Sequence, residues 1–209
     1  MSFIDSHCHL DLAESAEAWV ANAYRAGVGQ MITVSTHIGR GAVYQALAER
    51  FSGVYFSIGT HPHHAQEEAE TDVQAIRHFA AHEKCVAIGE AGLDYHYPSA
   101  PPAERVFRTH IALARELDLP IIIHAREADS EMARILQEEM RVGRFRGVLH
   151  CFTSSQPLAE IGLALGLFVS FSGVVTFKNS AALRAIARNV PLDRLLIETD
   201  APYLAPATR

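Results

Sequence analysis

The sequence predicts a (β/α)8 barrel of the TIM type, formed by a single domain over residues 1–209. Short apolar runs rich in β-forming residues recur every few tens of residues, and segments with helical periodicity separate them. No Ser/Gly-rich linker interrupts this alternation. Histidines and acidic residues directly follow several of the runs, at the strand ends where such barrels carry their functional side chains.

Eight apolar runs are the expected strands. They are 3–5, 31–34, 54–58, 86–88, 121–123, 147–149, 168–171 and 195–197. Most are continuously apolar, as expected of parallel strands that are covered on both faces. The uncharged stretch 161–177 is shorter than the roughly 20 apolar residues of a membrane-spanning helix. We therefore expect a helix end, a turn at Gly166 and a buried strand there, and no membrane association.

Apolar stripes at helical spacing predict four of the intervening helices. They are Val73, Ile76 and Phe79–Ala80 after the cap candidates Thr71 and Asp72; Val106–Phe107, Ile111, Ala114 and Leu117; Met132, Ile135–Leu136 and Met140; and Leu183, Ile186 and Val190. Strands that alternate with helices indicate βαβ units and a parallel sheet. Eight such units favour a closed barrel, and an open doubly wound sheet is the alternative.

Charge and cysteine content restrict the class of protein. With 18 Lys+Arg and 24 Asp+Glu the chain carries a net charge of −6, which lacks the broad basic field needed for sequence-independent DNA coating. Metal ions can still create a local phosphate-binding site. Cys8, Cys85 and Cys151 cannot all pair within one chain, and the first residues lack a signal-peptide pattern. A reducing, cytoplasmic location is therefore expected.

The first strand ends in a pattern typical of metal sites. His7 and His9 are two residues apart, and this spacing on an extended chain points both imidazoles to the same side. Two imidazoles directed at one point form half of a zinc-type site. Cys8 between them points the other way and is not an expected ligand.

Four further strands end in acidic residues or histidines. These are Glu90 after the fourth run, His124 after the fifth, His150 after the sixth, and Glu198 and Asp200 after the eighth. Each residue alone could be a strand-end histidine or an acid that caps a helix. Together with the first strand they place histidines and carboxylates at one end of the barrel, as a two-metal hydrolase requires.

Seven stretches extend this pattern along the whole chain. They are DSHCHLD at 5–11, GTHPH at 59–63, AIGEAGLDY at 87–95, PIIIHAR at 120–126, HCFT at 150–153, SFSG at 170–173 and ETDAPYL at 198–204. In this order they resemble the TatD-type metal-dependent deoxyribonucleases of the amidohydrolase superfamily. The resemblance implies a barrel with two divalent metal ions. It also implies that His7, His9 and Asp200 hold one ion, that His124 and His150 hold the other, and that Glu90 bridges them.

The chemistry expected of this site is metal-assisted hydrolysis of a phosphodiester, with DNA, either single-stranded or at duplex ends, as the substrate. Asp200 is the candidate general base. The candidates for binding phosphate oxygens are His61, His63 and Arg126, because a bidentate arginine suits that task. Asp94 and Glu198 are candidates for orienting the metal ligands. As alternatives, Arg126 could pair with a carboxylate, and His63 could be a solvated loop residue.

Two other functions fit the same residues. One is metal-dependent hydrolysis of an amide, a lactone or an acyl ester, and the other is a truncated metal-binding barrel without activity. Sites of histidine and carboxylate accept zinc, manganese, nickel or magnesium, depending on supply. The two ions are therefore expected to come from this group.

The barrel is expected to lack its C-terminal closing helix. The chain ends nine residues after Asp200, and outward-facing residues of the first and last strands, such as Ile4 and Leu196, then lack a cover. We expect a homodimer through this seam, or a tail 202–209 that folds across it, or coverage by the rest of a longer natural protein.

Overall fold

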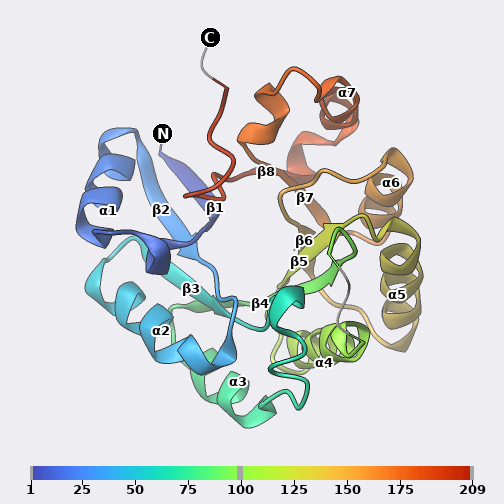
Figure 1. The fold of residues 1–209 in the computed structure, drawn as a ribbon, viewed down its shortest axis with the longest axis horizontal. Helices are drawn as coiled ribbons and strands as arrows, with labels where there is room; N and C mark the ends of the chain where they lie inside the picture. Colours follow the sequence, from blue (N-terminus) through green and yellow to red (C-terminus); the bar gives the residue numbers. More distant parts are fainter. Residues whose placement is uncertain (1, 98–100, 208–209) are drawn as a thin grey trace.

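Eight parallel strands line the inside of the computed structural model, which describes residues 2–97 and 101–207 (Figure 1). In chain order they are β1 (Phe3–Cys8), β2 (Val28–Thr33), β3 (Val54–Ile58), β4 (Cys85–Asp94), β5 (Ile121–Arg126), β6 (Gly147–Leu149), β7 (Phe168–Phe171) and β8 (Leu195–Ile197). Each strand pairs in parallel with the next. The predicted barrel is confirmed, and the open doubly wound sheet is excluded.

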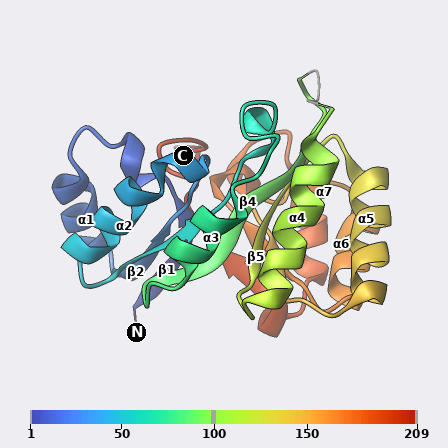
Figure 2. The ribbon, with the colours of Figure 1, turned by 90° about the horizontal axis from the view of Figure 1, so that it is seen from below.

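Helices cover the outside of this sheet (Figures 1 and 2). The described residues form α1 (Ala16–Arg25), α2 (Gly41–Arg50), α3 (Val73–Ala80), α4 (Ala103–Glu116), α5 (Asp129–Val142), α6 (Gln156–Ala164) and α7 (Ala181–Asn189). Short 3-10 helices occur at η1 (Leu10–Leu12), η2 (Ile38–Arg40), η3 (Pro62–His64), η4 (Gly173–Thr176) and η5 (Leu192–Arg194). Within the described ranges, none of the helices has the length and apolar character needed to cross a membrane.

Helix boundaries follow the apolar stripes and local capping. The four predicted stripes lie on α3, α4, α5 and α7, except that their last residues Leu117 and Val190 directly follow α4 and α7. The side chain of Asp72 accepts a hydrogen bond from the N–H of Ala75 at 2.9 Å and so starts α3, whose Ile76 is fully buried. Gly166 has a φ of 88°, a left-handed conformation that favours glycine, and it separates α6 from β7. The predicted turn and buried strand in this uncharged stretch are confirmed.

Alternation along the strands decides which side chains reach the lumen. Ile121 and Ile123 of β5 pack in the large core under the helices, whereas Ile122 belongs to a small separate cluster. His124 shares the face of Ile122 and so points into the mouth of the barrel. On β1, Cys8 packs in the helix-side core. The two histidines that flank it therefore face inward, as the sequence predicts.

Strand β4 is longer than the three-residue run that predicts it. It continues through Glu90, and its register against β5 is irregular at that point. The pairing advances by three residues on β4, from Ile88 to Ala91, but by two on β5, from Ile121 to Ile123. The extra residue makes a β-bulge, a feature that redirects side chains near functional sites.

A glycine makes this bulge sterically feasible. Gly89 has a φ of 112°, and a Cβ at this position would lie 2.6 Å from the carbonyl oxygen of Ile122. A side chain would therefore both strain the backbone and collide with β5. The bulge turns the side chain of Glu90 into the mouth of the barrel.

The seam between β8 and β1 is held differently from the rest of the sheet. Among the described residues these two strands share no ladder of paired positions. Beyond the strands, the N–H of Asp200 donates to the carbonyl of His7 at 2.9 Å, and the N–H of His9 donates to the carbonyl of Ala201 at 2.8 Å. The barrel is therefore closed at its C-terminal mouth.

An exposed apolar strip lies along the strands that meet at the seam. Ile4 is 53% exposed, as expected, and so are Phe3 at 57% and Ile197 at 48%. The expectation for Leu196 is wrong, because this residue is half-buried and its neighbour Ile197 is the exposed one.

The C-terminal tail does not cover this strip. Ala207 donates its N–H to the hydroxyl of Thr176 at 2.7 Å, and the tail passes so close to Gly173 that a Cβ there would meet the carbonyl of Leu204. The described part of the tail thus packs on η4 rather than across the seam, and residues 208–209 lie outside the described residues.

Candidate metal centre

Four histidines and two carboxylates converge at the C-terminal mouth of the barrel. They come from β1 (His7), from just after it (His9), from the bulge in β4 (Glu90), from β5 (His124), and from the turns after β6 (His150) and β8 (Asp200). Five of the six are buried, and His124 is half-buried. The structure therefore brings together all the residues that the sequence proposes as metal ligands.

Glu90 lies at the middle of this group. Its Oε2 atom is 3.4 Å from Nε2 of His7. Its Oε1 atom is 2.8 Å from Nδ1 of His124 and 2.7 Å from Nε2 of His150. The two oxygens of one carboxylate thus face different sets of histidines. This arrangement is suited to bridging two cations.

The first set of donors surrounds Asp200. Its Oδ1 atom lies 3.6 Å from Nε2 of His7 and 3.5 Å from Nε2 of His9, and these two nitrogens are 3.3 Å apart. Asp200 has a φ of 57°, a left-handed conformation that aspartate adopts more readily than most residues. This turn places its carboxylate back over β1.

The second set of donors includes a residue predicted for another role. Nε2 of His61 is 3.6 Å from Oε1 of Glu90, and the rings of His61 and His124 are 4.5 Å apart. The sequence pattern predicts a substrate-binding role for His61. The geometry makes it a further candidate ligand beside His124 and His150, with His61, Glu90 and His124 forming one convergent donor group.

Two more carboxylates contact these histidines from behind. Oδ2 of Asp94 is 3.0 Å from Nε2 of His124 and 2.9 Å from Nε2 of His63. Oε1 of Glu198 accepts a hydrogen bond from the N–H of Cys151 and lies 3.4 Å from Nδ1 of His150. These contacts orient the imidazoles toward the centre. They also hold His63 against Asp94.

The electrostatics of the centre favour charged carboxylates. Burial opposes the charge on Glu90, but His150, His61 and His7 hold the pKa of its carboxyl well below the usual range. Burial likewise opposes the charge on Asp200, whose pKa is lowered by a hydrogen bond from His9 and by His7. Both groups are therefore anionic at neutral pH and able to hold cations.

The donor set fits divalent metal ions. Ligand atoms about 2.0–2.2 Å from a tetrahedral zinc are roughly 3.3–3.6 Å apart, which matches the separations among His7, His9 and Asp200. The buried Nδ1 atoms of both histidines also lack a hydrogen-bond partner in the described part of the chain. Their Nε2 atoms converge instead on one point beside the carboxylate of Asp200. A cation at this point would be bound by both Nε2 atoms and by Oδ1 of Asp200.

Two residues without a predicted role in the site hold it in place. Asp5 accepts hydrogen bonds from the N–H of Thr199 at 2.9 Å and from its hydroxyl at 2.6 Å. His110, fully buried in α4, accepts the N–H of Thr60 at 3.1 Å and donates to the carbonyl of Val106 at 2.8 Å. A histidine within the apolar stripe of α4 was the available signal for the second of these.

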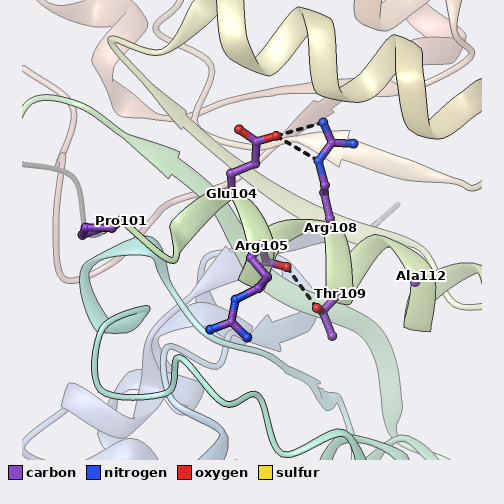
Figure 3. Close-up of a pocket in the computed structure, with 6 residues that line it drawn as sticks. All are labelled: Pro101, Glu104, Arg105, Arg108, Thr109 and Ala112. Atoms are coloured by element: carbon purple, nitrogen blue, oxygen red, sulfur yellow. Dashed lines mark hydrogen bonds and ion pairs between the residues drawn. The ribbon is translucent and has the colours of Figure 1, made fainter.

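Surface hollows lie apart from the centre. One is on the outer side of α4 and is lined by Pro101, Glu104, Arg105, Arg108, Thr109 and Ala112 (Figure 3). An ion pair between Glu104 and Arg108 lies in it, and none of its lining residues belongs to the metal centre. A second hollow, of about 440 Å³, lies between the turn after β6 and α7, on the same side as the mouth of the barrel.

A parallel barrel with histidines and carboxylates gathered at its C-terminal mouth belongs to the class of barrels suited to metal-dependent hydrolysis. Residues 4–209 match the family model described as TatD related DNase. The chain belongs to the TatD family of metal-dependent hydrolases.

Similar proteins agree with this membership. The chain is 42% identical over 214 residues to the uncharacterized metal-dependent hydrolase YcfH of Escherichia coli, covering 99% of this chain and 80% of that protein. It is 36% identical over 191 residues to the 3'-5' ssDNA/RNA exonuclease TatD of Cronobacter sakazakii, covering 90% and 72%. The crystal structure of YJJV, a TatD homologue from Escherichia coli, superposes with a TM-score of 0.88 at 31% identity, covering 98% and 81%.

Proposed function

We propose that this chain is a nuclease that hydrolyses phosphodiester bonds of DNA with two divalent metal ions. His7, His9 and Asp200 would hold one ion, His124 and His150 the other, and Glu90 both. The ions would be zinc, manganese, nickel or magnesium. Membership of the TatD family supports metal-dependent hydrolysis, and the exonuclease name of the Cronobacter relative supports a nucleic acid as the substrate.

The main support for a phosphodiester substrate is that the guanidinium of Arg126 has no carboxylate partner. Among the described residues, its guanidinium forms no ion pair with a carboxylate, and it lies over the ring of Tyr97 at 5.7 Å. The same ring is 5.1 Å from that of His63. An unpaired guanidinium beside a metal centre suits a phosphate, and the half-exposed tyrosine suits a stacked base. A neutral amide, lactone or acyl ester offers no such anionic group.

The roles of the residues follow from their positions. When bound, the two ions would activate water and neutralise charge on the phosphate. Asp200 would accept the proton of the attacking water as general base. Arg126 and His63 would bind phosphate oxygens, while His61 lies close enough to Glu90 to serve either the phosphate or the second ion. Asp94 would hold the imidazoles of His63 and His124 in their orientations, and Glu198 would orient the imidazole of His150.

The mouth of the barrel offers a path for a strand of nucleic acid. The hollow beside it has polar residues on one part of its wall, Thr153, Ser154 and Ser155 from the turn after β6 and Asn179 and Ser180 before α7, and apolar residues such as Val174, Leu183 and Ile186 on the rest. Hydroxyl and amide groups of this kind bind phosphates and sugars without base preference. This hollow supports a polymeric substrate rather than a small ester.

The test is hydrolysis of a 3′-labelled single-stranded oligonucleotide by chelated protein to which each metal is added back. A panel of amides, lactones and acyl esters is assayed in parallel. We expect turnover of the oligonucleotide only with added metal, and a loss of roughly 10–100-fold in kcat/KM for Arg126→Ala, the cost of a charge-assisted hydrogen bond of about 1.5–3 kcal/mol. Turnover of amides or esters alone would favour the first alternative function. Metal-loaded protein without any turnover would favour an inactive barrel.

We also propose a cytoplasmic location. The three cysteines are free in the structure, and two of them are buried. A reducing compartment suits a protein of this kind.

A further inference from the structure

Two exposed aromatic side chains lie on opposite sides of the mouth of the barrel. Tyr97 follows β4 by three residues, and Tyr203 follows β8 by six. Strand β8 is four strands on from β4 in a barrel of eight, so the segments after these strands lie across the mouth from each other (Figure 1). These are the two most exposed tyrosines of the chain, at 53% and 54%. Half-exposed rings offer contact area to a ligand, and nucleobases of any kind can stack on them.

Each ring is adjacent to a different set of metal donors. The ring of Tyr203 lies 6.0 Å from that of His9 in the first set. The ring of Tyr97 lies 5.1 Å from that of His63, whose ring is 6.4 Å from that of His124 in the second set. Two metal ions clamp a phosphate between them in sites of this kind. The nucleotides on the two sides of that phosphate would therefore extend toward the two tyrosines.

The turn that carries Tyr203 is fixed on both sides of the ring. The N–H of Tyr203 donates to the carbonyl of Asp200 at 2.9 Å, and the N–H of His9 donates to the carbonyl of Ala201 at 2.8 Å. Farther along the chain, the N–H of Ala207 donates to a hydroxyl of η4 at 2.7 Å. The ring is therefore held beside the first set of donors before a substrate binds, which lowers the entropy cost of binding.

The backbone on either side of this ring is strained. Asp200 has a φ of 57° and Leu204 has a φ of 52°, both in the left-handed region. Aspartate adopts this region more readily than most residues, whereas leucine seldom does. Strained backbone occurs most often at functional sites, where the surrounding structure holds it in place. The metal centre accounts for the conformation of Asp200, and a role for the ring of Tyr203 accounts for that of Leu204.

We propose that Tyr203 is a nucleobase-stacking residue that holds the base on one side of the scissile phosphate, while Tyr97 holds the base on the other side. This inference rests on the proposed nuclease function and deepens it. The substrate is a single strand, because the bases of a duplex are stacked on their own neighbours. Stacking accepts all four bases, so the site discriminates against base-free phosphodiesters and not between sequences.

Stacking also supplies affinity that the charge of this chain does not. The net charge of −6 provides no general attraction for the phosphates of nucleic acid. Contacts between rings and bases depend little on net charge, and one such contact on each side of the centre would also fix the register of the strand. The scissile phosphate would then be placed at the ions by the two bases that flank it.

The first test is hydrolysis of a single-stranded oligonucleotide at one mapped bond by wild type, Tyr203→Leu and Tyr203→Phe. Tyr203→Leu should raise KM roughly 5–150-fold, the value of one stacked base, with a much smaller change in kcat. Tyr203→Phe should retain the wild-type KM because it keeps the ring. Tyr24→Leu is the matched control, since Tyr24 is 42% exposed but lies on α1, away from the mouth.

The second test uses substrates in which the base on one side of the mapped bond, or on the other, is replaced by an abasic residue. Removal of one base should abolish the effect of Tyr203→Leu and preserve that of Tyr97→Leu, and removal of the other base should do the reverse. With both bases removed, neither variant should differ from wild type.

An unchanged KM for Tyr203→Leu in a protein whose wild type cleaves the oligonucleotide would overturn this inference and leave the nuclease function intact. A loss that persists when both flanking bases are absent would also overturn it, because a disturbed turn rather than stacking would then be the cause. So would coupling of both tyrosines to the same base. Wild-type protein that cleaves none of the oligonucleotides would overturn the proposed function, and this inference with it.

Discussion

The metal centre is built from two sectors of the barrel that are held together by different means. In the β4–β5 sector, the two strands pair at five positions on either side of the bulge, and α4 buries Phe107 and Ile111 against the outside. In the β8–β1 sector, the described residues form no ladder, and Ile4 is exposed on the outer face. Each sector nevertheless supplies ligands to the same centre. Ligand geometry therefore depends on packing in one sector and on a few hydrogen bonds at the mouth in the other.

The largest effect is expected from the residue that connects the sectors. Glu90→Gln removes the charge that faces both donor sets, so metal content should fall at both positions and turnover should be lost. His124→Ala changes only the β4–β5 donors and should cost about one equivalent. Elemental analysis of both variants measures the difference. If Glu90→Gln retains two equivalents, the bridge between the ions lies elsewhere.

The next effect concerns the β8–β1 sector alone. Asp200→Asn keeps the shape of the side chain but removes a general base, whose loss typically costs about 10²–10⁴-fold in rate. Turnover should therefore fall much further than metal content, with both quantities measured on the same sample. Equal proportional losses would reduce Asp200 to a metal ligand without a role in proton transfer.

A smaller effect is expected from the side chain that links the two strands of the seam. Asp5→Ala leaves the partly buried N–H of Thr199 without its acceptor, at a cost of about 1–3 kcal/mol in the free energy of unfolding. Asp5→Asn retains one acceptor oxygen and is the control with the smaller loss. Urea titrations measure both, and Asp5→Ala should weaken metal binding at His7 and His9 more than at His124. Weakening at all three ligands to the same degree would contradict the independence of the two sectors.

The smallest effect on activity is expected from the exposed apolar side chains of the seam. We propose that a second copy of the chain covers Ile4 and Ile197, so Ile4→Lys should convert a dimer to a monomer while activity changes little. Val43→Lys is the control, because Val43 is 43% exposed on α2, away from the seam. Sedimentation analysis measures the oligomeric state of both variants and of the wild type. A wild-type protein that is monomeric at all concentrations would reject the dimer.

Much of the centre could be predicted from the sequence because of a property of the fold. Parallel strands of a barrel bring their C-terminal ends to one mouth, so His124 and His150 converge once the strands are identified. The alternation of side chains similarly determines that His7 and His9 face inward while Cys8 does not. These features follow from local periodicity and require no knowledge of loop conformation.

Other features depended on contacts between distant residues, and only the tertiary structure decided them. The bulge at Gly89 sets the position of Glu90, and it depends on the close approach of the β5 backbone. The placement of His61 beside Glu90 depends on the hydrogen bond of its neighbour Thr60 to His110, which lies fifty residues beyond Thr60 in the chain.

The sequence alone determined the strands, the inward-facing ligands and the family, because each of these is encoded by local patterns. Only the tertiary structure decided how the seam is closed and that Ile197 rather than Leu196 is exposed there. It also placed Tyr203 beside His9. Loops and strand ends adopt these positions through long-range hydrogen bonds and packing, which a one-dimensional pattern of residue types does not specify.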